Sequence, residues 1–156
     1  MSLVTDLVFV QALRADQSLM QLLAAGDVYS TSIPLPDEDM DNAPLPYIIV
    51  TYDGMTNDGS TKDGYEGDSD RVKVSIEIAA PNREHLGLLA EAVRKSVRSW
   101  FEEHGGSYTT PDLSGLPSVM CEIEDYALSA GPVSYDPMKP CFYQTLSYDC
   151  DNNAET

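Results

Sequence analysis

The residue types most often used for catalysis and metal binding are few and widely spaced in this sequence. The two histidines, His85 and His104, are nineteen positions apart, so they cannot share a helical turn as paired metal ligands do. We expect both to be surface or helix-end residues. The sequence also has no phosphate-binding loop, nucleophile elbow or zinc-protease motif. It therefore predicts a protein that is not an enzyme and that holds no metal or cofactor.

Two groups of carboxylates could nevertheless bind a hard cation. Glu122 and Glu124 alternate along one expected strand, so they would share a face and could hold a cation or act as an acid/base pair; a solvated sheet face is the alternative. The run from Asp58 to Asp70 is rich in oxygen ligands, but Lys62 occupies its fifth place. Because calcium loops need an oxygen ligand at that place, we expect no dedicated calcium site there.

The charge of the chain sets limits on its partners. The 156 residues include 26 acidic and 9 basic side chains, for a net charge of −17. Such a field repels nucleic acid, whose binding requires Lys and Arg to displace phosphate counterions, and it disfavours anionic membranes. We therefore expect no membrane association and no tight nucleic-acid binding.

Length and composition indicate one domain over residues 1–150, followed by a disordered acidic tail over 151–156. The three cysteines, Cys121, Cys141 and Cys150, form no C-x-x-C pair. We expect reduced thiols, partly buried in strands, in a protein that is made in a cytoplasm. The first five residues carry no positively charged signal segment.

Capping residues and apolar spacing predict the helices. Thr5 is the expected N-cap of the first helix, and Asp16 that of a short second helix ending near Gly26. Asn82 should cap the strongest helix, which ends at Gly105-Gly106.

Alternation and β-branched residues predict five strands, over residues 28–33, 47–52, 71–79, 118–128 and 141–148. The resulting fold class is α+β, with a mainly antiparallel sheet of about four to five strands and helices packed on one face.

Two groups of charged residues are candidates for contacts with other proteins. Arg94, Lys95 and Arg98 hold three of the nine basic residues. They serve either helix solubility or a subunit interface with an acidic surface of an identical neighbour. A polar loop is expected over residues 54–70, and its acids are candidates for contact with a partner or a channel: Asp58, Asp63, Glu66, Asp68 and Asp70.

Three stretches carry a resemblance to a known family. They are the N-terminal helix with the run from Asp16 to Tyr29, Pro44-Leu-Pro46 followed by Tyr47-Ile-Ile-Val50, and Val72–Ile78 followed by Ala80-Pro81 and the helix that contains His85–Val93. Over residues 3–104, this pattern resembles phage tail-terminator or tail-completion proteins, which join the tail to the head.

The resemblance implies a structural subunit of a phage or prophage tail, assembled in the host cytoplasm. It would form a homo-oligomer, a hexameric ring, that caps the tail tube and contacts the tail tube protein and the head connector protein. Two alternatives stay open: an acidic DNA mimic that inhibits a DNA-binding protein, and another phage neck or head-completion protein.

Overall fold

The computed structural model describes residues 2–34, 43–57, 67, 69–111 and 114–154. Their elements, in chain order, are η1 (Ser2–Val4), α1 (Thr5–Ala15), α2 (Gln17–Leu23), β1 (Val28–Ser30), β2 (Tyr47–Asn57), β3 (Ser69–Ala80), α3 (Arg83–His104), β4 (Ser107–Thr109), β5 (Met120–Ala130), β6 (Ser134–Asp136) and β7 (Cys141–Asn153).

The α+β class is confirmed, but the sheet is larger than expected and it is mixed. Its order is β1-β2-β3-β7-β5-β4, and β6 pairs with the first residues of β7. β1 runs parallel to β2, whereas the other pairings are antiparallel. The additional strands β4 and β6 have three residues each, too few for an alternating pattern to reveal them.

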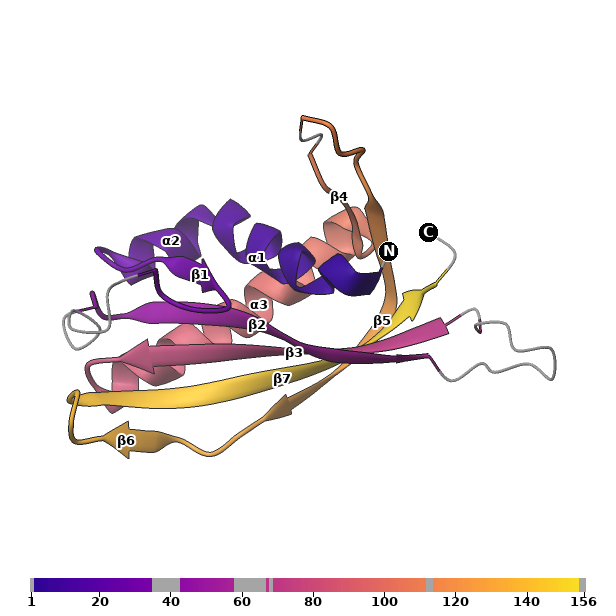
Figure 1. The fold of residues 1–156 in the computed structure, drawn as a ribbon. Coiled ribbons are helices and arrows are strands. Elements are labelled where there is room, and N and C mark those ends of the chain that lie inside the picture. Colours follow the sequence, from indigo (N-terminus) through magenta and orange to yellow (C-terminus); the bar gives the residue numbers. More distant parts are fainter. Residues whose placement is uncertain (1, 35–42, 58–66, 68, 112–113, 155–156) are drawn as a thin grey trace.

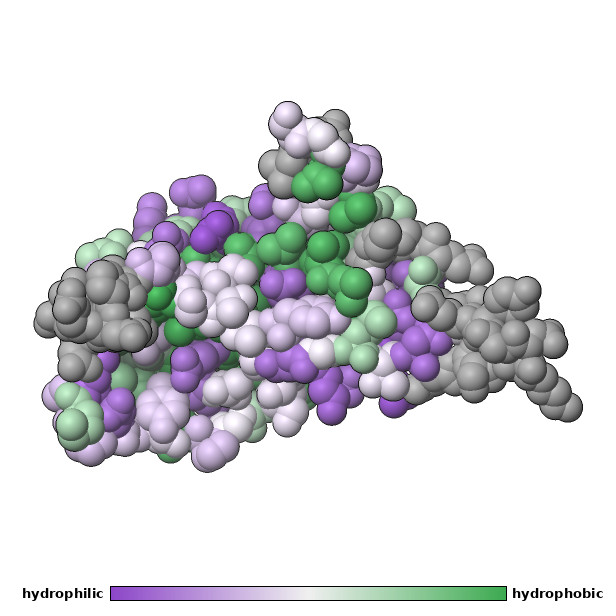
Figure 2. All heavy atoms as spheres, in the orientation of Figure 1, coloured by the Kyte–Doolittle hydropathy of each residue, from purple (hydrophilic) through white to green (hydrophobic). Residues whose placement is uncertain are grey.

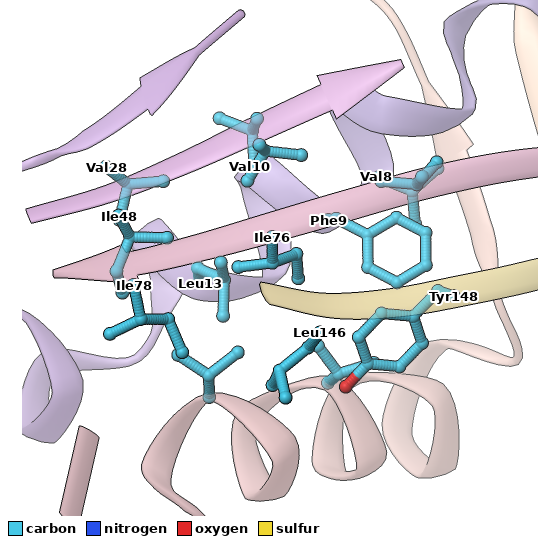
Figure 3. Close-up of a cluster of buried hydrophobic side chains, with 14 of the residues drawn as sticks. Val8, Phe9, Val10, Leu13, Val28, Ile48, Ile76, Ile78, Leu146 and Tyr148 are labelled. Atoms are coloured by element: carbon cyan, nitrogen blue, oxygen red, sulfur yellow. The ribbon is translucent and has the colours of Figure 1, made fainter. Parts of the chain in front are cut away.

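α1 and α3 cover one face of the sheet, and α2 packs against both helices (Figure 1). Apolar side chains from these helices interdigitate with every second residue of the central strands. In Figure 3, Phe9 and Leu13 of α1 lie in one cluster with Ile76, Leu146 and Tyr148 of the sheet. All five are at most 4% exposed, so the layers form one continuous core.

Three of the predicted helix ends are confirmed. The Asp16 carboxylate accepts a hydrogen bond from the backbone N–H of Leu19, and the Asn82 side chain accepts one from His85 N–H. Gly105 ends α3 with φ 64°, a left-handed conformation that glycine adopts without a steric penalty.

The predicted cap at Thr5 is wrong. Val4 is the N-cap of α1 and makes no side-chain capping bond. Thr5 is fully buried, where its hydroxyl donates to the Ser2 carbonyl and accepts from the Asn152 amide. Asn152 lies 147 positions away in β7, so no local pattern could show that this hydroxyl has a tertiary role.

Gly26 is also not the helix terminator that we expected. Ala24 ends α2, with φ 51°. Gly26 is required for close approach instead, because a Cβ there would lie 1.6 Å from the Pro46 carbonyl oxygen.

The predicted start of the acidic tail, at residue 151, lies inside the last strand. β7 continues through Asn153, and Asn152 is completely buried. The polar side chains of Asp149 and Asp151 suggested a frayed end, but they alternate with buried Cys150 and Asn152 and lie on the solvent face. Residues 155–156 lie outside the described part of the chain.

The three cysteines are unpaired thiols and all are buried, as expected. Burial raises the pKa of the Cys150 thiol to about 12, helped by the neighbouring Asp149 carboxylate. No helix in the described residues is long and apolar enough to cross a membrane.

Candidate functional site: surfaces for assembly

The predicted cationic cluster lies on an exposed flank of α3. Arg94, Lys95 and Arg98 are all exposed and, with Glu91 and Ala92, line a shallow hollow of about 360 Å³. The cluster leaves three positive charges open to a partner.

The opposite flank of α3 faces α1 and α2. Ser96, Ser99 and Trp100 line a hollow there together with Asp16, and the Ser96 hydroxyl donates to the Asp16 carboxylate. The cationic cluster therefore points to the other side of the molecule, where Phe101 stacks on Tyr126 of β5 at 4.7 Å between ring centroids.

The predicted acidic loop is shorter than expected, because β2 extends to Asn57 and β3 begins at Ser69. Asp58, Asp63, Glu66 and Asp68 lie outside the described residues, so their role stays a prediction.

Asp70 was predicted to be a loop residue, and this is wrong. It lies in β3 and is 6% exposed. Its carboxylate accepts from the Ser2 hydroxyl at 2.6 Å and from the Asn57 amide at 2.7 Å. The same Asn57 side chain also bonds the backbone of Gly67. Asp70 thus ties the N-terminal turn to the base of the β2–β3 hairpin.

A charged strip on the solvent face of the sheet was not predicted. Arg71 and Lys73 of β3 stand beside Asp151 and Asp149 of β7 in register, and Arg71 forms an exposed ion pair with Asp151 at 3.6 Å. Arg71, Lys73 and Asp149 line a hollow of about 480 Å³ together with Asp53. The sequence shows basic residues at every second position of one strand and acidic residues at every second position of another. This pattern could have indicated the strip only if the pairing of the two strands had been known.

The other candidates show no convergence on a metal site. Within the described ranges, no three His, Cys, Asp or Glu side chains gather closely enough to hold an ion. His104 stacks on Trp100 in the last turn of α3, with 3.8 Å between ring centroids. A bulge in β5 between Ile123 and Asp125 interrupts the strand beside Glu124.

Large apolar side chains are also exposed on several elements. Figure 2 shows apolar surface over the N-terminal helical segment, at the foot of the projecting β4–β5 hairpin. Leu3 there is 64% exposed, and Leu116 in the hairpin loop is 63% exposed. Side chains of this kind usually become covered when proteins associate.

Comparison with known families shows which kind of protein carries these surfaces. The family described as "Tail completion protein gp17" matches residues 8–115, about two thirds of the chain. The chain belongs to this tail completion family. No curated protein matches it significantly. Membership of the tail completion family makes the chain a structural component of a phage tail or neck, and the resemblance stated from the sequence is thus confirmed.

A solved structure of a phage-like particle has a similar fold. A chain of the "Virion of native gene transfer agent (GTA) particle" superposes with a TM-score of 0.57 at 13% sequence identity. The match covers 96% of this tail completion protein and 94% of that chain. At this identity, the likeness establishes a shared fold that includes the C-terminal strands beyond residue 115.

Proposed function

We propose that this tail completion protein forms a ring of identical subunits, a hexamer by resemblance, that caps the tail tube and joins it to the head connector. The observation that carries the proposal is the family match over residues 8–115. The likeness to a chain of a gene transfer agent virion, whose fold is shared almost from end to end, supports a place within such a particle.

The distribution of charge supports self-assembly. The chain has only nine basic residues, and three of them, Arg94, Lys95 and Arg98, form one exposed patch on α3. A positive patch on a strongly acidic protein is attracted to almost any other part of an identical copy. It is not attracted to itself, so it would meet a different surface of the neighbouring copy. When such a contact repeats head to tail and its rotation closes, it forms a ring.

The acids between β2 and β3 fit a channel or tube contact under this proposal. Asp58, Asp63, Glu66 and Asp68 follow one another in sequence with one base, Lys62, between them. A carboxylate-lined passage would let double-stranded DNA slide, because it offers no cations to displace phosphate counterions. Asp70 would hold the base of this hairpin rather than face the channel.

Electron microscopy of the purified protein, alone and with tail tubes, tests the proposal. We expect rings of a fixed subunit number, seated on the ends of the tubes. A chain that stays monomeric in the presence of tubes would refute the ring. Binding to the head connector but not to tubes would instead identify a different neck or head-completion protein. A tight 1:1 complex with a DNA-binding protein, without rings, would identify a DNA mimic.

Charge reversal tests the role of the α3 patch. Arg98→Glu should abolish rings without unfolding the chain, since this side chain is exposed. Arg83→Glu, also on the exposed surface of α3 but outside the patch, is the matched control and should assemble normally. Equal loss of rings in both variants would show that net charge, rather than this patch, controls assembly.

A further inference from the structure

Besides the three-residue strands β1, β4 and β6, two longer stretches of the sheet have no neighbouring strand on one side, among the residues that the structure describes. β4 pairs only with Met120–Glu122 of β5, which leaves Asp125–Ala130 open on the side away from β7. β1 pairs only with Ile48–Val50 of β2, which leaves Tyr52–Thr56 open on the side away from β3. Open edges of this kind are templates for pairing with another chain.

The two open edges lie at the same height along the strands. The pairings of β5 with β7, β7 with β3 and β3 with β2 place Leu128 level with Tyr52. By the same route, Asp125 is level with Thr56. Each open stretch thus begins where its short covering strand ends, and a copy placed beside the molecule at the same height would bring one against the other.

Strand direction allows the sheet to continue across such a contact. β2, β3, β7 and β5 are successively antiparallel, so β5 runs opposite to β2. A second copy rotated about an axis along the strands would present its own β2 antiparallel to β5. The antiparallel ladder would then pass from copy to copy without a reversal.

The backbone groups at the two edges face outward. The Tyr126 N–H donates to the Asp125 carboxylate at 2.8 Å, so it points away from β7. Alternation then turns the N–H and C=O of Leu128 and Ala130 outward as well. On β2, the Val50 carbonyl accepts from Thr31 of the covering segment, which by alternation turns Tyr52 outward.

Side chains beside these edges are complementary. Tyr126 and Leu128 of β5 are half-buried and pack on the rim of the core. Met55 of β2, which is 40% exposed, pairs with Val72 and so lies on the same face of the sheet. In a continued sheet, Met55 of one copy would lie beside Tyr126 of the next, because Met55, Val72, Cys150 and Tyr126 are level with one another.

The positive charge beside the β5 edge disfavours a symmetric contact, in which the β5 edges of two copies would pair with each other. Phe101 follows Arg98 by three positions and Arg94 by seven, so it shares their side of α3. Its ring contacts Tyr126 of β5, with 4.7 Å between the ring centroids. The cationic flank of α3 therefore lies beside the β5 edge. Two β5 edges meeting about a two-fold axis would bring these cations against each other, which disfavours that pairing.

From this geometry, we infer that Asp125–Leu128 of one copy pairs antiparallel with Tyr52–Thr56 of the next, so that the sheets of neighbouring subunits join through their backbones. This inference rests on the proposed ring and specifies which surfaces form its subunit contact. The α3 patch would then lie next to the joined strands.

Cysteine crosslinking tests the pairing directly. Ala127 and Thr56 are exposed and lie on the solvent face of their strands, where diagonal neighbours on paired strands are about 7–8 Å apart. Rings of Ala127→Cys/Thr56→Cys treated with a short thiol crosslinker should yield a ladder of linked chains, up to the ring number. Each single variant should yield no ladder.

The matched control replaces Thr56→Cys by Met138→Cys, in the turn between β6 and β7. Met138 is 88% exposed, so random collisions would crosslink it more readily than Thr56. An equal ladder from the control pair, or efficient dimers from Ala127→Cys alone, would overturn the inference. Intact rings without a ladder from the test pair would also overturn it, while leaving the proposed function in place; absence of rings on tail tubes would refute the function itself.

Discussion

The Asp16 carboxylate joins α2 to α3, and its removal should destabilise the protein more than loss of a single cap. Oδ1 accepts from Leu19 N–H at 3.2 Å and begins α2, while Oδ2 accepts from the Ser96 hydroxyl of α3. Ser96 is only 4% exposed. Asp16→Ala would therefore remove a cap and leave a buried hydroxyl without its acceptor.

The two losses can be given magnitudes separately. Replacing an aspartate N-cap by alanine costs about 1 kcal/mol. Leaving a buried hydroxyl unsatisfied costs about 1–3 kcal/mol more. We therefore expect Asp16→Ala to lower the free energy of unfolding by about 2–4 kcal/mol. Ser96→Ala removes the donor but leaves the half-exposed carboxylate and its cap in place, so it should cost only about 0.5–1.5 kcal/mol.

Urea unfolding of the monomer at one fixed protein concentration measures both effects. Asp16→Asn is the matched control: its amide can still cap Leu19 and contact Ser96, so it should lie within about 1 kcal/mol of the parent. The double variant Asp16→Ala/Ser96→Ala should cost less than the sum of the two singles, because no hydroxyl is then left without an acceptor. A loss below about 0.5 kcal/mol in Asp16→Ala, or strict additivity in the double variant, would refute the reasoning.

Four further outcomes follow from the structure. Gly26→Ala should lower the free energy of unfolding, measured in urea, by roughly 3 kcal/mol, because its Cβ would meet the Pro46 carbonyl. Gly105→Ala should lower it by only about 1 kcal/mol, because the positive φ is the only obstacle to a Cβ there. Burial raises the pKa of the Asp6 carboxyl, so the folded state holds this proton more tightly than the unfolded chain; its contribution to stability is present at acidic pH and is lost as pH rises through the folded pKa. The free energy of unfolding of Asp6→Asn should therefore rise relative to that of the parent between pH 4 and pH 7. A difference in unfolding free energy that does not change with pH would contradict this. The Cys150 thiol, with its pKa raised to about 12, should react with a thiol reagent at pH 8 only after urea unfolding; labelling of the native protein at this position would show that the strand opens. Six copies with a net charge of −17 carry −102 together, so rings should form better at higher ionic strength, and light scattering that showed tighter assembly at low salt would count against the acidic ring.

The elements that the sequence predicted well are those whose signals are local. The apolar stripe of α3 and its cap at Asn82 depend on residues within a few turns, and both are present. The alternation of Val72, Val74, Ile76 and Ile78 likewise corresponds to a strand with one fully buried face. Where the structure depends on residues close in sequence, the residue types were sufficient to predict it.

The features that were missed depend on contacts between distant residues. Thr5 and Asn152 are buried because they bond to each other, and Asp70 is buried because Ser2, 68 positions away, donates to it. Each of these side chains, taken alone, is typical of a cap, a tail or a loop. The assembly surface was only partly predictable for the same reason: Arg94, Lys95 and Arg98 could be identified as a cluster, but the height and direction of the two open edges require the full pairing of the sheet.

Open edges and extreme acidity act against each other in this molecule, which bears on when it assembles. Unprotected edges pair readily with any strand, and natural sheets usually blunt them. Here the β5 edge has one N–H covered by the Asp125 carboxylate, and the β2 edge has a bulge between Tyr52 and Gly54. A net charge of −17 adds a repulsion that every pair of free copies must overcome. If the edges form the subunit contact, free chains would remain apart at low ionic strength, and a partner that neutralises part of the charge would promote pairing. Under the proposed function, that partner would be the tail tube, and assembly would be favoured at its end over polymerisation of free chains.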